Sequence, residues 1–466
     1  MSVSLRFRLL IMGACLASGS WALGGNWRAV TPVVETRYRP NPGKGWILYG
    51  DPASRRFTNL PAEAWAIGSI GYMRFNWAEL ESAPGVTQWG IVERAISECR
   101  AHGLPFAFRV FCANYFGKGR SSKATPDWVF AKGARGVGEE GASRVPVWDD
   151  PVFLQCIQAF HRALAKRWDG DPSIAFIDLG SYGNWGENHL STLSAFSAPI
   201  DSKTFLESHA LPFKAAFQRT PVAVCSKDDD SKNLRFLDEN PEVLEATSVR
   251  LAAAGFWLRW DGAVCGVSPA RPLRHAAVGT PKILEWCFTY EETLRLVRGW
   301  KDRLSQDLAE SGASYLGLGL WRGDAASILA AEGPLVEAAG RRLGYEFIVR
   351  NIALEPGRAN VSPRALRVSI EATGLAPCPP AFRLSLASLD DSGLVLGRIP
   401  VDGVRPNEWE PGKTVEVRLD VPSPPPAGAR RIALGFYSSG TSPEPDVRFF
   451  NKYPEGSLWF PLAEFL

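Results

Sequence analysis

The sequence lacks the features that mark several large protein classes. Its net charge is only +3 over 466 residues, which gives no support for binding to nucleic acid or to an anionic membrane. No internal repeat or low-complexity tract is present. The eight cysteines form no C-x-x-C motif and no cluster with histidine, which argues against a zinc site. We therefore expect no metal and no cofactor, and we expect buried free thiols more than disulfides.

A long apolar run is also missing, because the apolar stretch at the N-terminus is too short to span a membrane. Residues 1–22 have the pattern of a signal peptide instead. Arg6 and Arg8 precede the apolar run Leu9–Leu16, and Ser20–Ala22 provides small residues for cleavage. We therefore expect export to the periplasm or the extracellular space. Lipid attachment at Cys15 is the alternative, although Met12 fits poorly at the first position of such a signal.

What the sequence does contain is enough apolar material for a large core. Hydrophobic residues make up 45% and charged residues 22% of the chain, and the length fits one large domain and a smaller one. Seventeen tryptophans are present. Most of them are expected in the core, but exposed tryptophan rings also stack well on the C–H faces of sugars.

Short apolar strands alternate with amphipathic helices through the first three hundred residues or so, which favours parallel βα units. The expected strands are Ile47–Tyr49, Ile70–Trp77, Pro105–Phe111, a strand from Ile174, Pro221–Ser226, Ala246–Trp257, Lys282–Cys287 and Tyr315–Leu320. The expected helices include Ile91–His102, Val152–Trp168, Tyr290–Leu308 and Ala325–Arg341. Eight strands over this length predict an α/β fold, a (β/α)₈ TIM barrel over residues 37–342.

The character of the chain changes near Tyr345. Residues 345–466 are rich in proline and glycine and contain short strand-like runs, which predict a β-sandwich. The expected strands are Tyr345–Ile352, Ala365–Glu371, Phe382–Leu386, Thr414–Leu419, Arg431–Tyr437 and Val447–Phe450. This second domain would either pack against the barrel or bind carbohydrate as an accessory module.

Two glutamates lie at the ends of expected barrel strands. The run Ile174–Glu187 reads as a buried strand, a turn of small residues and then Glu187, while Glu285 ends the seventh strand. Strands four and seven face each other across a barrel, so the two carboxylates can meet at its mouth. A facing pair of carboxylates is what glycoside hydrolysis needs. Asp261 and Asp324 are alternatives to Glu285.

Other residues at strand ends are candidates for the wall of the same site. Arg74 and Arg109 would either orient a catalytic carboxylate or tie barrel strands together. His189 would tune Glu187 or lie in a solvated loop, and the loop is favoured; Asp228–Asp230 is expected to be a solvated charge run. The residues expected to bind substrate are Arg74, Asn76, Trp77, Arg109, Asn114, Tyr115, Asn184, Trp185, Trp286 and Trp321.

With these residues in view, the chain resembles the clan A glycoside hydrolases. More closely, it resembles a family of exported bacterial proteins in which a glycosidase-like barrel is fused to a C-terminal β-sandwich. The matching stretches are NPGKGW at Asn41–Trp46, RFNWAELE at Arg74–Glu81, VPVWDDPVF at Val145–Phe153, GSYGNWGE at Gly180–Glu187 and GYEFIVRNIAL at Gly344–Leu354. The resemblance implies Glu187 as acid/base and Glu285 as nucleophile.

One position departs from the clan pattern, in which an asparagine directly precedes the acid/base and binds the 2-hydroxyl of the sugar. Gly186 stands there, and Asn184 lies two residues earlier as a substitute.

The sequence thus predicts an exported, retaining glycoside hydrolase with a carbohydrate substrate. A carboxyl separation near ~5 Å would mean retention, and ~6.5–9.5 Å inversion. One alternative is a non-catalytic carbohydrate-binding protein, with carboxylates far apart or tied up in a salt bridge. Another is a polysaccharide lyase, in which Arg74 or Arg109 serves β-elimination on an acidic sugar in a cationic cleft.

Overall fold

The computed structural model describes residues 27–465, except 59, 118–119, 139–142, 227–240, 265–272, 274–278, 321–322, 357–362, 422–424 and 441. The expected signal peptide, Cys15, Asp228–Asp230 and Trp321 lie outside the described residues. Among the described helices, none combines the length and the apolar character needed to cross a membrane. The six cysteines described are free thiols.

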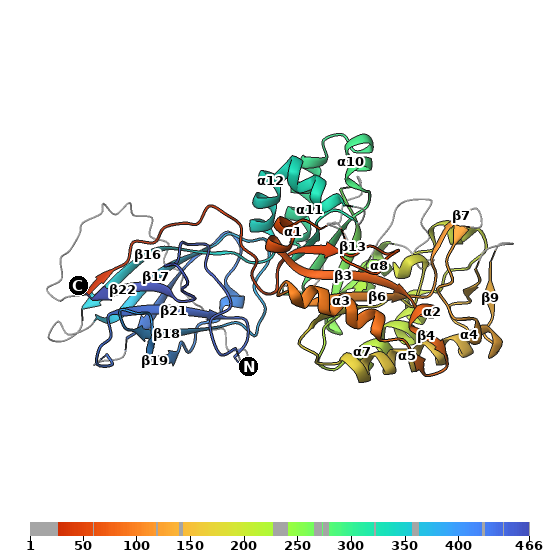
Figure 1. Cartoon of the computed structure of the whole chain (residues 1–466), viewed down its shortest axis with the longest axis horizontal. Coiled ribbons are helices and arrows are strands. Elements are labelled where there is room, and N and C mark those ends of the chain that lie inside the picture. Colours follow the sequence, from red (N-terminus) through yellow and green to blue (C-terminus); the bar gives the residue numbers. More distant parts are fainter. Residues whose placement is uncertain are drawn as a thin grey trace, which may run out of the picture.

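Eight parallel strands close into a barrel, which confirms the predicted (β/α)₈ fold (Figure 1). Its strands, in the order in which they pair, are β11 (Ile174–Asp178), β12 (Val222–Cys225), β13 (Phe256–Ala263), β14 (Lys282–Trp286), β15 (Tyr315–Gly317), β2 (Gly45–Tyr49), β3 (Gly68–Asn76) and β6 (Phe106–Phe111). Most positions of these strands are buried because both faces are covered, as in other all-parallel sheets.

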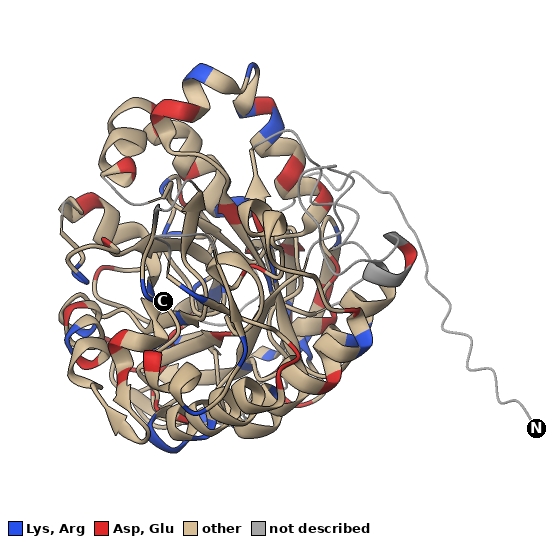
Figure 2. Ribbon diagram, turned by 90° about the vertical axis from the view of Figure 1, so that its right-hand side faces the viewer, with Lys and Arg blue, Asp and Glu red and all other residues tan. Residues whose placement is uncertain are grey.

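Helices surround the barrel, and charged residues of both signs are spread over them (Figure 2). The helices are α1 (Ala62–Ile67), α2 (Trp77–Leu80), α3 (Gly90–Ala101), α4 (Asp127–Ala131), α5 (Pro151–Trp168), α6 (Ser202–Phe205), α7 (Leu211–Ala216), α8 (Pro241–Ala253), α10 (Tyr290–Leu296), α11 (Trp300–Ser311) and α12 (Asp324–Arg342). The helix α5 starts at a clear signal, because the Asp150 side chain caps it and Pro151 occupies its first position.

Two sequence predictions in the barrel are wrong. The expected strand Ala246–Trp257 is mostly the helix α8, which ends before Gly255, a residue in the left-handed region (φ 89°). The strand β13 begins at Phe256, so Arg259 and Asp261 lie within it rather than after it. The expected helix Tyr290–Leu308 is split into α10 and α11, because Gly299 adopts a left-handed conformation (φ 71°).

Shorter elements decorate the barrel loops. They are the strand pairs β4 (Glu81–Ala83) with β5 (Val86–Thr87), β7 (Tyr115–Gly117) with β8 (Arg120–Ser121), and β9 (Gly136–Val137) with β10 (Val145–Pro146), and the helical turns η1 (Asn184–Gly186), η2 (Ser191–Ala195) and η3 (Leu206–Ala210).

Two antiparallel sheets form the C-terminal sandwich. One contains β16 (Phe347–Pro356), β17 (Pro363–Ala372) and β20 (Thr414–Asp420). The other contains, in order, β1 (Trp27–Ala29), β22 (Phe460–Phe465), β21 (Arg431–Tyr437), β18 (Arg383–Leu389) and β19 (Val395–Pro400). A short turn, η5 (Pro406–Glu408), precedes β20. Val447–Phe450, predicted as a strand, contributes only an isolated bridge to Phe436.

The sandwich packs beneath the N-terminal ends of the barrel strands, which fits the packing role among the two roles considered. Residues 30–44 connect β1 to the barrel, so the N-terminal segment links both domains (Figure 1). Asn41 accepts a hydrogen bond from the Arg448 backbone and donates one to its carbonyl, and the Tyr345 hydroxyl donates to the Pro42 carbonyl. A cavity of about 750 Å³ at this junction is lined by strand starts and by Ser438 and Asp446.

Asn41→Ala removes both hydrogen bonds to Arg448 and leaves two backbone groups without partners. We expect it to lower the free energy of unfolding by about 1–3 kcal/mol. Denaturant unfolding measures the loss, with Asn407→Ala, in the sandwich turn η5, as the control expected within about 0.5 kcal/mol of the parent. Equal stability of the parent and Asn41→Ala would contradict a fastening role.

Candidate active site

A cavity of about 480 Å³ opens at the C-terminal ends of the barrel strands, on the face opposite the sandwich. Both predicted carboxylates, Glu187 and Glu285, line it. Among the predicted binding residues, Arg74, Asn114, Trp185 and Trp286 also lie in its wall. The remaining lining residues are Tyr49, Gly50, Pro52, Met73, Phe111, Phe116, Asp261, Cys287, Phe288, Thr289, Glu292 and Leu320. This is the face at which (β/α)₈ barrels carry their active sites.

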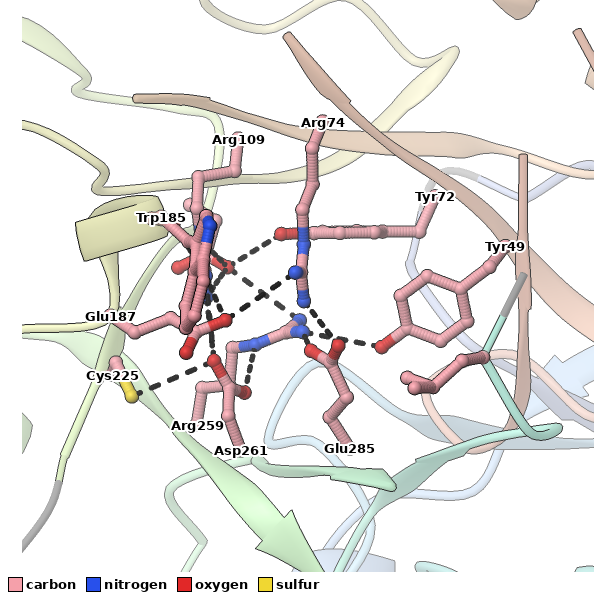
Figure 3. A network of polar contacts seen from close by, with 12 residues as sticks. Tyr49, Tyr72, Arg74, Arg109, Trp185, Glu187, Cys225, Arg259, Asp261 and Glu285 are labelled. Carbon is pink, nitrogen blue, oxygen red and sulfur yellow. Dashed lines mark hydrogen bonds and ion pairs between the residues drawn. The ribbon is translucent and has the colours of Figure 1, made fainter. Parts of the chain in front are cut away.

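The floor of the cavity is a network in which the carboxylates of Asp178, Glu187, Asp261 and Glu285 alternate with the guanidinium groups of Arg74, Arg109 and Arg259. Figure 3 shows how the three arginines converge on Glu187, Asp261 and Glu285. Arg74, on β3, contacts Glu187 at 3.3 Å and also pairs with Glu285 at the end of β14. Arg74 therefore touches both predicted catalytic carboxylates with the two terminal nitrogens of one group. Because that group is small and planar, it holds the two carboxylates close to each other.

The other two arginines close the network from below. Arg109, on β6, lies 2.7 Å from Asp178, 3.3 Å from Asp261 and 3.5 Å from Glu187. Arg259, on β13, lies 3.6 Å from Asp178 and 2.5 Å from Asp261, and it also pairs with Glu285. Each carboxylate thus contacts two of the three guanidinium groups. Ion pairs this deeply buried are kept only where every charge is compensated.

Two tyrosines complete the network. The Tyr72 hydroxyl donates to Asp178 at 2.8 Å, and the Tyr49 hydroxyl accepts a hydrogen bond from Arg259 at 3.2 Å. Burial raises the pKa of Tyr49 to about 12, so its hydroxyl stays neutral in the cavity wall.

Glu187 sits in a tight turn whose backbone departs from ordinary conformations. Trp185, Asn188 and Ser191 all have φ between 47° and 58°, a region that residues other than glycine rarely adopt. Such backbone persists only where the surroundings hold it. Here, Trp185 donates its backbone N–H to Ala113, and the Asn188 side chain donates to the Cys225 carbonyl at 2.6 Å.

Asn184 fastens the same turn to the loop after β6. Its side chain accepts from the Tyr115 N–H at 3.0 Å and donates to the Tyr115 carbonyl at 2.7 Å. Asn184 is fully buried and lies outside the cavity lining. The idea that it replaces the clan A asparagine is therefore wrong.

Gly186 explains why that asparagine is missing. Its φ is +66°, and a Cβ atom there would lie 2.5 Å from the Gly180 Cα. Real Cβ atoms do not approach backbone so closely, so no side chain fits at this position without moving the turn.

The groups around Glu187 shift the pKa of its carboxyl in opposite directions. Burial is the largest influence and raises the pKa of the Glu187 carboxyl, and the nearby Asp261 carboxylate adds to this. The hydrogen bond from His189 and the charge of Arg74 together outweigh both, so the pKa lies below its usual value. These surroundings therefore favour the ionised form of Glu187.

Several predicted site residues lie elsewhere. Trp77 is fully buried, donates its indole N–H to Glu81 at 2.8 Å and packs on Phe160, so its placement in the mouth is wrong. The predicted position of Asn76 at the mouth is also wrong, because Asn76 caps α2 and its side chain accepts a hydrogen bond from Asn114. The cap and the aromatic packing turn both side chains away from the cavity.

Tyr115 and Arg109 are likewise buried and outside the lining, so neither forms the wall. Tyr115 packs its ring against Phe196, and Arg109 lies beneath the carboxylates, as the tying or orienting role requires. Asp324 is not at the cavity either, because its carboxylate accepts from the Leu320 N–H. His189 is 1% exposed and contacts Glu187, so the solvated loop favoured for it is wrong.

Sequence reasoning missed Arg259, Asp178 and Phe116 as parts of the site. Arg259 lies on β13, beyond the expected strand that ended at Trp257. Asp178 follows four apolar residues on β11, and a carboxylate ending such a run was the available signal. Phe116 is 52% exposed, and its ring lies 5.6 Å from that of Trp185.

No family model and no curated protein sequence matches this chain. Among solved structures, it is similar to endo-glycoceramidase II from Rhodococcus sp., with TM-score 0.38 and 14% identity over 84% of this chain and 99% of that one. A GH5_18 protein from Bifidobacterium longum subsp. infantis aligns with TM-score 0.40 and 13% identity over 64% and 74%. An exo-β-1,4-mannosidase from Opitutaceae bacterium strain TAV5 aligns with TM-score 0.39 and 13% identity over 66% and 57%. At these values the likenesses decide neither fold nor activity, so both rest on the strands and side chains above.

The residues described contain no group of three or more His, Cys, Asp or Glu placed to hold a metal ion. The polar atoms at the cavity floor instead face arginine side chains.

Gly186→Ala tests the constraint on the turn. We expect a loss of about 1–3 kcal/mol in the free energy of unfolding, because Cβ meets the Gly180 backbone in a strained conformation. Gly90→Ala is the matched control, since a Cβ there meets nothing within 4 Å and Gly90 begins the helix α3. Alanine at that helix position should be neutral or slightly stabilising. If both variants unfold at the same denaturant concentration, the close approach does not constrain the turn.

Proposed function

We propose that this protein is an exported glycoside hydrolase that cleaves O-glycosidic bonds by a retaining mechanism. Glu285 acts as the nucleophile and Glu187 as the acid/base. The observation that carries the proposal is the contact of one guanidinium group, Arg74, with both carboxylates at the floor of a cavity of substrate size. Export rests on the pattern of residues 1–22.

The surroundings of Glu285 suit a nucleophile. Arg74 and Arg259 both pair with it, and two neighbouring positive charges favour the ionised carboxylate. In the first step, its oxygen would bond to the anomeric carbon while Glu187 protonates the departing oxygen. In the second step, Glu187 would take a proton from water, whose oxygen attacks the anomeric carbon and releases Glu285.

The lyase alternative is disfavoured by the charges in the cavity. An acidic sugar needs a cation that is free to bind it, and Arg74 is the only Lys or Arg in the described lining. Arg74 already pairs with two carboxylates, and within the described part of the chain the network has four carboxylates and three arginines. The substrate is therefore expected to be a neutral sugar.

One observation favours the non-catalytic carbohydrate-binding alternative, which expects a salt-bridged carboxylate. Glu187 and Glu285 are both salt-bridged. A hydrolase and a binding protein differ in turnover, because a binding protein retains the sugar without hydrolysing it.

A panel of neutral aryl glycosides and oligosaccharides tests the activity. We expect hydrolysis with retained anomeric configuration, read by proton NMR of the first-formed product. Glu187→Gln should lower kcat by about 10²–10⁴-fold on substrates with poor leaving groups. Glu285→Gln should abolish measurable turnover, because it removes the nucleophile.

Glu291→Gln, an exposed neighbour on α10, is the control expected to keep full activity. Inversion of configuration would refute the roles assigned to the two carboxylates. Sugar binding by calorimetry with no turnover of any glycoside would favour the binding protein.

Phe116 provides an aromatic lip beside Trp185 at the open side of the cavity. We expect Phe116→Ala to raise KM about 3- to 10-fold with little change in kcat, because an aromatic contact contributes about 0.5–1.5 kcal/mol. Leu394→Ala, which removes an exposed apolar side chain from the sandwich, is the control. An unchanged KM for Phe116→Ala would show that substrate does not contact the lip.

A further inference from the structure

Among the residues that the structure describes, the buried network holds more carboxylates than guanidinium groups. Asp178, Glu187, Asp261 and Glu285 supply four carboxylates, and Arg74, Arg109 and Arg259 supply three guanidinium groups (Figure 3). All seven side chains are at most 12% exposed. Carboxylates gathered in such surroundings stabilise a proton held beside them, because a buried charge is expensive unless it is compensated.

The structure provides a place for that proton at His189. Its Nε2 atom lies 3.0 Å from the Glu187 Oε2 atom, and the residue is 1% exposed. The other oxygen of Glu187 faces Arg74 at 3.3 Å and Arg109 at 3.5 Å. His189 is therefore the titratable partner of Glu187 on the side that the arginines leave open.

We propose that His189 is a positioning residue that shares one proton with Glu187 and stores it for the reaction. Without substrate the proton resides on the imidazole, where it compensates the surrounding carboxylates and leaves Glu187 ionised. This assignment rests on the proposed function only for its catalytic consequence, because the shared proton exists in the protein without substrate.

The charged groups around the pair come from four strands. Arg74 approaches from β3, Arg109 from β6, Asp261 from β13 and Glu285 from β14. The Trp185 ring lies edge-on to the imidazole, with ring centroids 5.9 Å apart. The two arginines oppose protonation of Glu187, whereas the surplus of carboxylates favours a cation at His189.

In the proposed reaction the stored proton moves in a balanced sequence. His189 passes a proton to Glu187, and Glu187 gives a proton to the departing glycosidic oxygen as that oxygen takes the bonding electron pair from the anomeric carbon. Glu285 forms the new bond to that carbon. In the second step, the attacking water loses its proton to Glu187, and the pair is again protonated once, as at the start.

Nitrogen NMR of the histidine ring tests the proposal without any substrate. In protein labelled at histidine, we expect His189 to remain an imidazolium well above pH ~6.5, where a free imidazole loses its proton. In Glu187→Gln the charge that holds the proton is gone, so the imidazolium signal should disappear at lower pH. His102, an exposed residue stacked on Trp65, serves as the internal control, because its ring signals should be the same in both proteins.

A neutral His189 ring throughout this range in the parent protein would overturn the proposal, and so would identical titration in Glu187→Gln. Either result leaves the hydrolase assignment standing, because product stereochemistry tests that separately.

Kinetics provide the second readout. In His189→Gln, Glu187 alone must hold the proton between two arginines, so the upper limb of the pH profile of kcat/KM should move to lower pH by about one unit or more. His102→Gln should leave the profile unchanged. An unshifted upper limb in folded His189→Gln would count against the shared proton even if the enzyme is active.

Discussion

Arg109 and Asp178 form an ion pair with no exposed side-chain surface in the centre of the barrel, and the site is built outward from it. Barrel interiors of this fold are usually filled by branched apolar side chains. Here three arginines and four carboxylates occupy that space, and such a group tolerates no loss of a member. Each carboxylate is held by two guanidinium groups. The positions of the carboxylates are therefore fixed before any substrate binds. Preorganised charge of this kind is the main source of catalytic power in many enzymes.

The second constraint is the turn that carries Glu187. This residue is nine positions beyond the end of β11, and its carboxylate still reaches the network because the turn is fastened on two sides. Asn184 ties it to the loop after β6 and Asn188 ties it to β12. The Asn184 amide is engaged in this contact and therefore cannot reach a sugar. The Gly180 backbone lies so close to the turn that only glycine fits at position 186. If the proposed hydrolase activity is right, a group other than the clan A asparagine binds the sugar 2-hydroxyl.

Much of the fold could be predicted from sequence because the evidence for it is local. Seven of the eight barrel strands were placed nearly correctly from apolar runs bounded by turns and helices. The eighth, β13, was misplaced by several residues, and Arg259 and Asp261 were thereby set outside the strand. The strand β1 was missed because its pairing with β22 joins opposite ends of the chain, which no local pattern reveals.

The side chains of the site could be predicted from sequence only in part. Glu187 and Glu285 meet in one network because Glu285 lies at the end of β14 and the turn after β11 carries Glu187 to the same end of the barrel. The direction of a neighbouring side chain depends on its packing, so Trp77 and Asn184 could not be separated from Trp185 and Asn114 by sequence. The contact between His189 and Glu187 could not be predicted from sequence, because it depends on the unusual backbone of the turn. In an ordinary loop, an imidazole two residues after a glutamate would not reach its carboxylate.

The central claim is that Glu285 attacks the sugar, and covalent trapping tests it most directly. The protein would be incubated with a set of neutral 2-fluoro glycosides that carry good leaving groups, and the labelled peptide would be identified by mass spectrometry. A glycosyl adduct on Glu285 that is absent in Glu285→Gln is the predicted result. An adduct on Asp261 or Glu187 instead, or hydrolysis of these glycosides with inverted configuration, would contradict the mechanism.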